Sequence, residues 1–184
     1  MMIDRDRFES KFVPVSDLLP RGSAILSDCG TYRYRLERDI GRFGNSSLAF
    51  IMVNPSTADA TADDATIRKC MGFAERNGFG RLIVGNKFAF RATDVRALIK
   101  ADNAIGPDND AHLEQIARDA DLLVAAWGPL SKLPRWLRSR WYAIAAIADR
   151  VGKPLHCFGT AQDGHPRHPL MLAYDTSLVE WSQP

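Results

Sequence analysis

Residues 48–61, LAFIMVNPSTADAT, contain the pattern that decides the fold. The first six residues are all apolar, which is typical of a β-strand that is covered on both faces. Asn54 and Pro55 then end the strand and begin a polar turn. A buried strand followed by a polar turn is typical of parallel sheets, whose ligands bind beyond the carboxyl ends of the strands.

The sequence before this strand predicts another strand over residues 31–38, where apolar and polar side chains alternate. Such alternation indicates one buried face and one face in water, with Arg33 and Arg35 on the wet side. Turn-forming residues separate the two strands, so we expect residues 31–38 and 48–53 to form a hairpin. Residues 1–30 are expected to be irregular, because prolines and glycine interrupt any regular pattern.

The sequence after the turn alternates helical patterns with three more apolar strands, at residues 81–84, 122–126 and 155–158. An aspartate at position 63 or 64 can cap the first helix. Strands that alternate with helices form right-handed crossovers and a mostly parallel sheet. We therefore expect a single α/β domain over residues 1–184, a three-layer sandwich with a mostly parallel central sheet and an N-terminal antiparallel strand.

The composition is that of a globular protein, with 46% hydrophobic and 25% charged residues in 184. No apolar run approaches the roughly 18 residues that span a membrane, and the N-terminus lacks the apolar core of a signal peptide. The three cysteines are odd in number and far apart, which argues against a disulfide framework. These features predict a soluble, cytoplasmic protein without a membrane partner. The net charge of +2 leaves nucleic acid open as a partner.

Polar residues follow each of the four apolar strands, and a parallel sheet would bring them to one edge. The first group can contact a ligand through hydroxyl and amide groups, or can serve only as a turn and helix cap. It consists of Asn54, Pro55, Ser56, Thr57 and Asp59.

The second group follows residues 81–84 and suits a nucleobase and its phosphate. The amide of Asn86 can read a base edge, Phe88 can stack on a base, and Arg91 can meet phosphate. The alternative is an asparagine that fixes a loop and a phenylalanine of the core, and for Phe88 we favour the core.

The third and fourth groups are Trp127 with Gly128 and the segment 165–169, HPRHP. Trp127 can wall a pocket or belong to the core, and Gly128 permits close approach of backbone. His165 or His168 can act as an acid or electrostatic group, with Arg167 between them, or the segment can be a structural loop. A His-x-x-His pair without further ligands is weak evidence for zinc, so we expect no metal and no other cofactor.

Two common reaction types lack their motifs. The sequence has no Gly-x-x-x-x-Gly-Lys-Ser/Thr loop, which argues against a standard P-loop nucleotidase. It has no Gly-x-Ser-x-Gly elbow, which argues against hydrolases of that type. Cys157 lies inside an apolar strand, where an inert buried thiol is favoured over a nucleophile.

Three segments of the sequence resemble the bacterial domain-of-unknown-function family 1643. They are residues 52–59, MVNPSTAD, residues 63–68, DDATIR, and residues 164–170, GHPRHPL. The resemblance covers about residues 28 to 181, and the family name implies no activity.

The order of the motifs also resembles, more distantly, the uracil-DNA glycosylase superfamily. There an Asn-Pro or Asp-Pro loop follows the first core strand, a base-reading asparagine follows a later strand, and a His-Pro loop follows the last. The resemblance implies that Asn54 positions a water molecule, Asn86 reads the base, and His165 or His168 stabilises the departing base. The chain departs from the pattern, because Met52-Val53 replace the leading Gly-x and Arg167 follows the first His-Pro.

The sequence and this resemblance together predict N-glycosidic bond hydrolysis on a base in nucleic acid or a nucleotide, a hydrolase chemistry found in DNA repair. A non-catalytic module that binds a nucleotide or modified base in the same crevice is the main alternative. A small-molecule hydrolase of another kind is the third reading.

Overall fold

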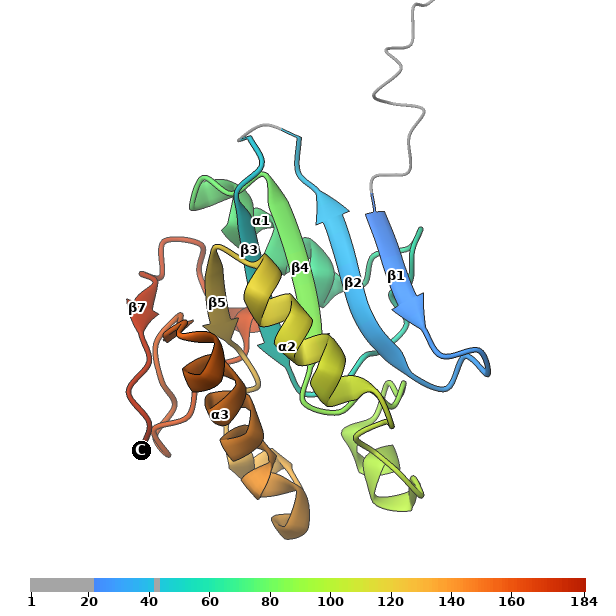
Figure 1. Ribbon diagram of the computed structural model, residues 1–184. Helices are drawn as coiled ribbons and strands as arrows, with labels where there is room; N and C mark the ends of the chain where they lie inside the picture. The colour runs from blue at the N-terminus through green and yellow to red at the C-terminus, as the bar shows by residue number, and fades with distance from the viewer. Residues whose placement is uncertain (1–21, 42–43) are drawn as a thin grey trace, which may run out of the picture.

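A computed structural model describes residues 22–41 and 44–184 of the chain. These residues form one seven-stranded sheet in the order β1-β2-β4-β3-β5-β6-β7 (Figure 1). The strands are β1 (Gly22–Leu26), β2 (Arg33–Asp39), β3 (Ser47–Met52), β4 (Arg81–Asn86), β5 (Leu122–Ala125), β6 (Leu155–Cys157) and β7 (Val179–Glu180). The main helices are α1 (Ala65–Arg76), α2 (Asn109–Asp119) and α3 (Trp141–Val151).

The centre of the sheet is parallel and is covered by helices on both faces. β4, β3, β5 and β6 are neighbours and run in the same direction. Helix α1 packs through Ile67 and Phe73 on one face, whereas α2 and α3 pack on the other face, for example through Ile116 and Ile144 (Figure 1). The prediction of an α/β fold with helices on both faces of a parallel core is therefore confirmed. The antiparallel part is larger than expected, because β1, β2 and β7 all pair antiparallel.

The predicted hairpin between residues 31–38 and 48–53 is wrong. β2 pairs antiparallel with β4, and β4 separates it from β3. All six residues of β3 are buried, so this strand occupies the middle of the sheet between two parallel neighbours. The apolar run correctly predicted this central position, and that position leaves no room for a hairpin partner.

The prediction that residues 1–30 are irregular is wrong for β1, which forms the edge of the sheet beside β2. Residues 1–21 lie outside the described part of the chain. Gly22 pairs with Arg38, whose side chain occupies the space where a Cβ would stand. Gly22, which the sequence suggested as an interruption of regular structure, thus leaves room for the side chain of Arg38 to lie across the edge strand.

The arginines of β2 are buried, whereas the alternation predicted a wet face. Arg33 and Arg35 are 2% and 6% exposed. The register between β1 and β2 passes from Arg35 to Arg33 without Tyr34, which indicates a β-bulge. A bulge reverses the alternation of side chains, so Arg33 and Arg35 point to different faces. Arg35 meets Asp119 at the end of α2, and Arg33 meets Ala58 in the loop after β3.

The helix that was expected near Asp64 begins as predicted. The carboxylate of Asp64 accepts a hydrogen bond from the backbone N–H of Ile67 at 2.9 Å and caps α1. In the described part of the chain, no helix has the length and apolar character needed to cross a bilayer.

Candidate functional site

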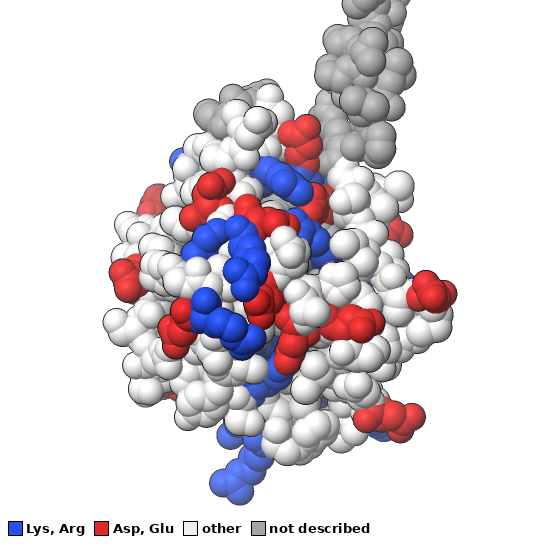
Figure 2. Space-filling model, in the orientation of Figure 1, with Lys and Arg blue, Asp and Glu red and all other residues white. Residues whose placement is uncertain are grey.

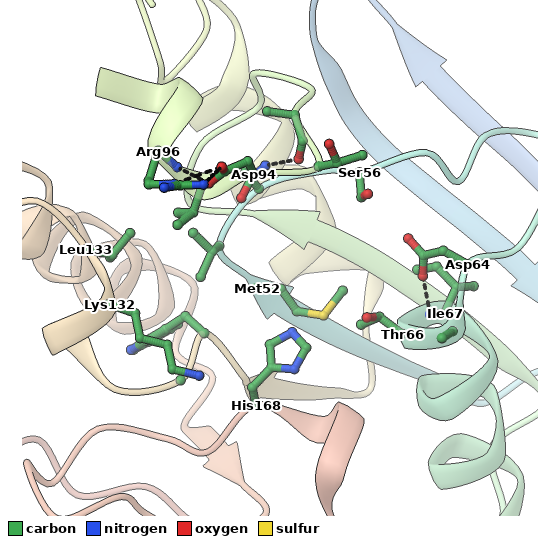
Figure 3. A pocket seen from close by; sticks show the side chains of 18 of the residues that line it. Met52, Ser56, Asp64, Thr66, Ile67, Asp94, Arg96, Lys132, Leu133 and His168 are labelled. Carbon is green, nitrogen blue, oxygen red and sulfur yellow. Dashed lines mark hydrogen bonds and ion pairs between the residues drawn. The ribbon is translucent and has the colours of Figure 1, made fainter. Parts of the chain in front are cut away.

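A pocket of about 650 Å³ lies beyond the carboxyl ends of the parallel strands (Figure 3). The connections after β3, β4 and β5 and the loop after β6 all contribute to its wall. Its polar lining residues are Arg33, Asn54, Ser56, Asp64, Thr66, Thr93, Asp94, Arg96, Lys132 and His168. The volume is in the usual range for a site that holds a small molecule or a nucleotide.

The topology of the sheet explains the position of the pocket. After β3 the chain crosses through α1 on one face of the sheet, and after β5 it crosses through α3 on the other face. Because the two chain segments leave neighbouring strands in opposite directions, a crevice opens between the strand ends. Met52 and Asn54 form one side of this crevice, and Trp127 and Gly128 form the other.

His168 projects into the pocket from the loop after β6 (Figure 3). Its Nδ1 atom accepts a hydrogen bond from the backbone N–H of Leu170 at 3.3 Å, at the start of the 3₁₀ helix η5 (Pro169–Met171). Burial and the positive charge of Lys132 lower the pKa of His168. The imidazole is therefore neutral near pH 7, and its proton is on Nε2, because Nδ1 acts as an acceptor.

Arg33 places a buried positive charge in the pocket wall. The β-bulge turns its side chain toward the loop after β3, where Nη1 donates to Ala58 O at 2.6 Å and Nη2 donates to Asn86 Oδ1 at 3.4 Å. Its Nε is buried without a hydrogen-bond partner. Burial lowers the pKa of Arg33 to about 10, so the guanidinium remains charged at neutral pH. No carboxylate of the described residues forms an ion pair with it, so an anionic ligand can meet this charge.

Asp64 brings a carboxylate to the pocket wall at the N-terminus of α1. One oxygen caps the helix at Ile67 N. Figure 3 shows Asp64 and Thr66 together at the start of α1, with Thr66 nearer to the imidazole of His168. The charge of Asp64 acts on both Arg33 and His168, which places all three within electrostatic range.

Asn54 holds the loop after β3 in place. Its Nδ2 donates to Ala92 O at 2.7 Å and to Pro55 O at 3.1 Å. The backbone N–H of Ala92 in turn donates to Pro55 O, so the loops after β3 and β4 are joined. The amide group of Asn54 is occupied by backbone, and its carbonyl oxygen is the atom left for a ligand.

Sequence comparison gives a family for the chain. A family model described as "Protein of unknown function (DUF1643)" matches residues 33–170. The chain belongs to the DUF1643 family. No curated protein and no solved structure matches it. The matched range begins at Arg33 and extends past His168, so it contains the whole lining of the pocket in this DUF1643 protein.

The structure brings some of the residues singled out from the sequence to this pocket. Asn54, Ser56, Trp127, Gly128 and His168 line it. Each of them lies at the end of a parallel strand or in the loop that follows, as we expected from the alternation of strands and helices.

The other candidate residues do not line the pocket. Some of them have structural partners, and others are exposed. Pro55 is buried below the loop and Thr57 is exposed. Asp59 Oδ1 accepts hydrogen bonds from Thr61 and Ala62, which lower the pKa of its carboxyl group. The remaining three are Phe88, a fully buried core residue, Arg91, whose Nη1 donates to Gly30 O, and Arg167, which is exposed.

Asn86 also lies outside the pocket wall. It is 1% exposed at the end of β4, where its Oδ1 accepts from Arg33 and its Nδ2 has no partner. Arg33 thus stands between Asn86 and the pocket. Arg33 lines the pocket, so Asn86 can act on a ligand there through the position of that guanidinium.

His165 lies in an aromatic cluster and not in the pocket. Its ring stands edge-on to Trp141 at 5.3 Å and lies 6.0 Å from Trp181. It is 5% exposed, and burial lowers its pKa. The two histidines of the HPRHP segment therefore have different surroundings, one facing the pocket and one enclosed by tryptophans.

Sequence reasoning missed Arg33, Asp64 and Lys132 as lining residues of this DUF1643 protein. Asp64 was recognised only as a helix cap, and Lys132 lies in a connection with no recognisable pattern. No local pattern marked Arg33, because the bulge that turns it toward the pocket depends on the pairing of β2 with β1. In the described residues, no cluster of three or more His, Cys, Asp or Glu side chains could hold a metal ion.

Proposed function

We propose that the pocket hydrolyses the N-glycosidic bond of a base in nucleic acid or a nucleotide. The single observation that carries the proposal is the neutral His168, whose Nε2–H lies in a pocket that the carboxylate of Asp64 also lines. A donor aimed at the departing base and a carboxylate near the sugar are the two groups that this bond cleavage needs.

The proposed chemistry requires only these groups and a water molecule. The bond between the base and C1′ breaks, and the base leaves with the electron pair. The Nε2–H of His168 stabilises the negative charge that develops on the base. Asp64 stabilises the cationic sugar and accepts a hydrogen bond from the water that attacks C1′. The attacking water gives one proton to Asp64, which passes it to solvent, and the base anion takes up one proton from solvent, so the products are the neutral free base and a sugar with a hydroxyl at C1′.

Arg33 supports a substrate with a phosphate group. Its charge is buried and unpaired by carboxylate, and burial strengthens its attraction to an anion. Ser56 and Thr66 offer hydroxyl groups to the polar edge of a base.

A non-catalytic module that binds a modified base or nucleotide in this pocket is the second candidate. It is favoured by Asn54, whose amide group is held by two backbone carbonyls. An asparagine fixed in this way has only its Oδ1 atom to position water. The binding module would use the same contacts of Arg33, Ser56 and His168 without cleaving a bond.

An assay of base release separates the two candidates. The protein is incubated with oligonucleotides and mononucleotides that carry uracil, mismatched or modified bases, and free base is measured by chromatography. We expect release by the parent protein and a large loss in His168→Ala and Asp64→Asn. Tight binding of the same ligands with no release by the parent would leave the binding module and exclude the hydrolase.

A further inference from the structure

A basic segment with an exposed tryptophan adjoins the pocket, which Lys132 and Leu133 of this segment line. It contains the 3₁₀ helices η3 (Leu130–Lys132) and η4 (Arg135–Arg140) between β5 and α3. Trp136 is 59% exposed, whereas Leu133 and Leu137 are buried beside Phe88. The two leucines anchor the segment to the core, so the fold does not need the indole of Trp136 for packing.

The positive charges around Trp136 are not neutralised by neighbours. Lys132, Arg135 and Arg138 form no ion pair with any described residue, in contrast to Arg140, which pairs with Asp110. Arg138 Nε donates to Leu133 O and so helps to hold the segment in shape. The carboxylate of Asp163 is occupied by the backbone N–H of Leu130. Figure 2 shows Lys and Arg side chains projecting at the end of the molecule where η4 lies in Figure 1.

Lys132 connects this segment to the pocket. Its side chain lines the pocket wall beside Leu133, as Figure 3 shows, and Trp136 follows four residues later. Lys132 therefore belongs both to the pocket wall and to the exposed basic segment that continues with Arg135 and Trp136.

We propose that Lys132, Arg135, Trp136 and Arg138, here called the η4 surface, bind a single strand of nucleic acid that leads into the pocket. This inference rests on the proposed function and narrows its substrate class from nucleotides in general to a polymer. The indole of Trp136 stacks on a base next to the one that enters the pocket, and the three cations contact the phosphates.

The combination of groups favours nucleic acid over other polyanions. An acidic peptide would satisfy the three cations but would offer no flat π-face to the indole. A membrane would require a wider apolar area than one tryptophan among charges. Alternating phosphates and bases match alternating cations and an aromatic ring.

The experiment measures binding by anisotropy of a fluorescein-labelled 15-nucleotide oligothymidylate between 50 and 200 mM salt (values chosen to span roughly the range of strong screening). Trp136→Ala is expected to weaken binding about tenfold or more, and Trp136→Phe to restore most of it. Arg135→Gln is expected to reduce the slope of log K against log salt by about 1. The matched controls are Tyr142→Ala, an equally exposed aromatic at 61%, and Arg150→Gln, a cation paired with Glu114.

The outcomes of this test are distinct from those of the base-release assay. Oligonucleotide binding that depends on Trp136, with no base release, supports the η4 surface and contradicts the hydrolase. Base release that is unchanged in Trp136→Ala, on polymers and mononucleotides alike, supports the hydrolase and overturns the η4 surface. Binding of polyglutamate or of phosphatidylserine vesicles with the same dependence on Trp136 also overturns it, since the surface would then bind polyanions of any kind.

Discussion

Two cations are buried at the same edge of the sheet, and their surroundings differ. Arg33 lines the pocket on the α1 side and donates to two oxygens. Lys87, just after β4, is fully buried on the α2 and α3 side, and its Nζ has no hydrogen-bond partner among the described residues. Its Nζ lies over the ring of Trp127, 5.0 Å from the ring centroid. Trp127 lines the pocket with part of its surface and covers Lys87 with its ring.

The two histidines of the HPRHP segment differ in their surroundings, as the two cations do. His168 faces the pocket beside Lys132, and His165 is enclosed beside Trp141 and close enough to Lys87 to sense its charge. A position at or after a strand end therefore does not by itself make a residue part of the candidate site. The surroundings decide, because His168 lies in the pocket between the strand ends, whereas Trp141 and Trp181 enclose His165.

We expect the greatest difference in base release between variants of the two histidines. His168→Ala should reduce base release by roughly 10²–10³-fold, because it removes the donor to the departing base. His165→Phe should leave release within a few-fold of the parent and change the melting temperature instead, since it alters an aromatic cluster. The measurements are initial rates of base release and thermal unfolding of both variants. An inactive His165→Phe variant with parental stability would place the site on the wrong side of the sheet.

Replacement of the two buried cations should have different consequences: Lys87 should affect how the stability of the protein depends on pH, and Arg33 should affect ligand binding. Burial lowers the pKa of Lys87 from 10.5 to about 7. Between these values the unfolded chain binds a proton that the native protein has released, so this group adds stability as pH rises, by up to about 1.4 kcal/mol per pH unit. Lys87→Met lacks this dependence, and it replaces an unpartnered ammonium by an apolar group of similar shape.

We therefore expect Lys87→Met to be more stable than the parent at pH 7 and to lose that advantage toward pH 10. Arg33→Met should instead weaken binding of a phosphate-bearing ligand by about tenfold or more. Denaturant unfolding at several pH values and ligand titration provide the two measurements. If Lys87→Met destabilises the protein by the same amount at every pH, Lys87 has a partner in solution and the contrast with Arg33 fails.

The strands could be predicted from the sequence because buried parallel strands consist of continuous apolar residues, as residues 48–53 do. Strand pairing could not, because the order of strands depends on contacts between distant segments. β2 joined β4 and not β3, although its sequence and the following turn favoured a hairpin.

The site was predicted in part for a similar reason. Asn54 and His168 follow apolar strands, so their sequence positions revealed them. Arg33 reaches the pocket only because the register between β1 and β2 skips Tyr34, and no local pattern encodes that bulge. The sequence indicated Asp64 as a helix cap. Its place in the pocket wall depends on the path of the loop after β3, which the sequence did not indicate.

A smaller effect separates the two roles of Asp64. Asp64→Asn keeps a side-chain oxygen that can cap α1, so stability should change by less than about 1 kcal/mol. It removes the negative charge that faces the sugar, so base release should fall by roughly tenfold or more. Asp64→Ala should lose both release and about 1 kcal/mol of stability. Equal base release by Asp64→Asn and the parent would reduce Asp64 to a cap and leave the catalytic proposal without its carboxylate.

The smallest expected effect concerns the glycine on the other side of the crevice. Gly128 has φ +75°, and a Cβ built there would lie 3.4 Å from His168 Cβ. Gly152, at the end of α3, has a similar φ of +71°, and a Cβ there would meet no atom within 4 Å. Gly128→Ala and Gly152→Ala should therefore cost the same backbone strain, about 1 kcal/mol, seen as similar losses of melting temperature.

Only Gly128→Ala should also affect catalysis. The added methyl group would contact His168 Cβ at 3.4 Å, at the tight limit of van der Waals distance, so we expect it to press on His168 and change the direction of its Nε2–H. A several-fold loss of base release is expected in Gly128→Ala and none in Gly152→Ala. Because the strain is matched, the difference between the two rates measures the position of His168 alone. Equal rates in the two variants would mean that the pocket tolerates a displaced His168, and the precise donor geometry proposed for this side of the sheet would not hold.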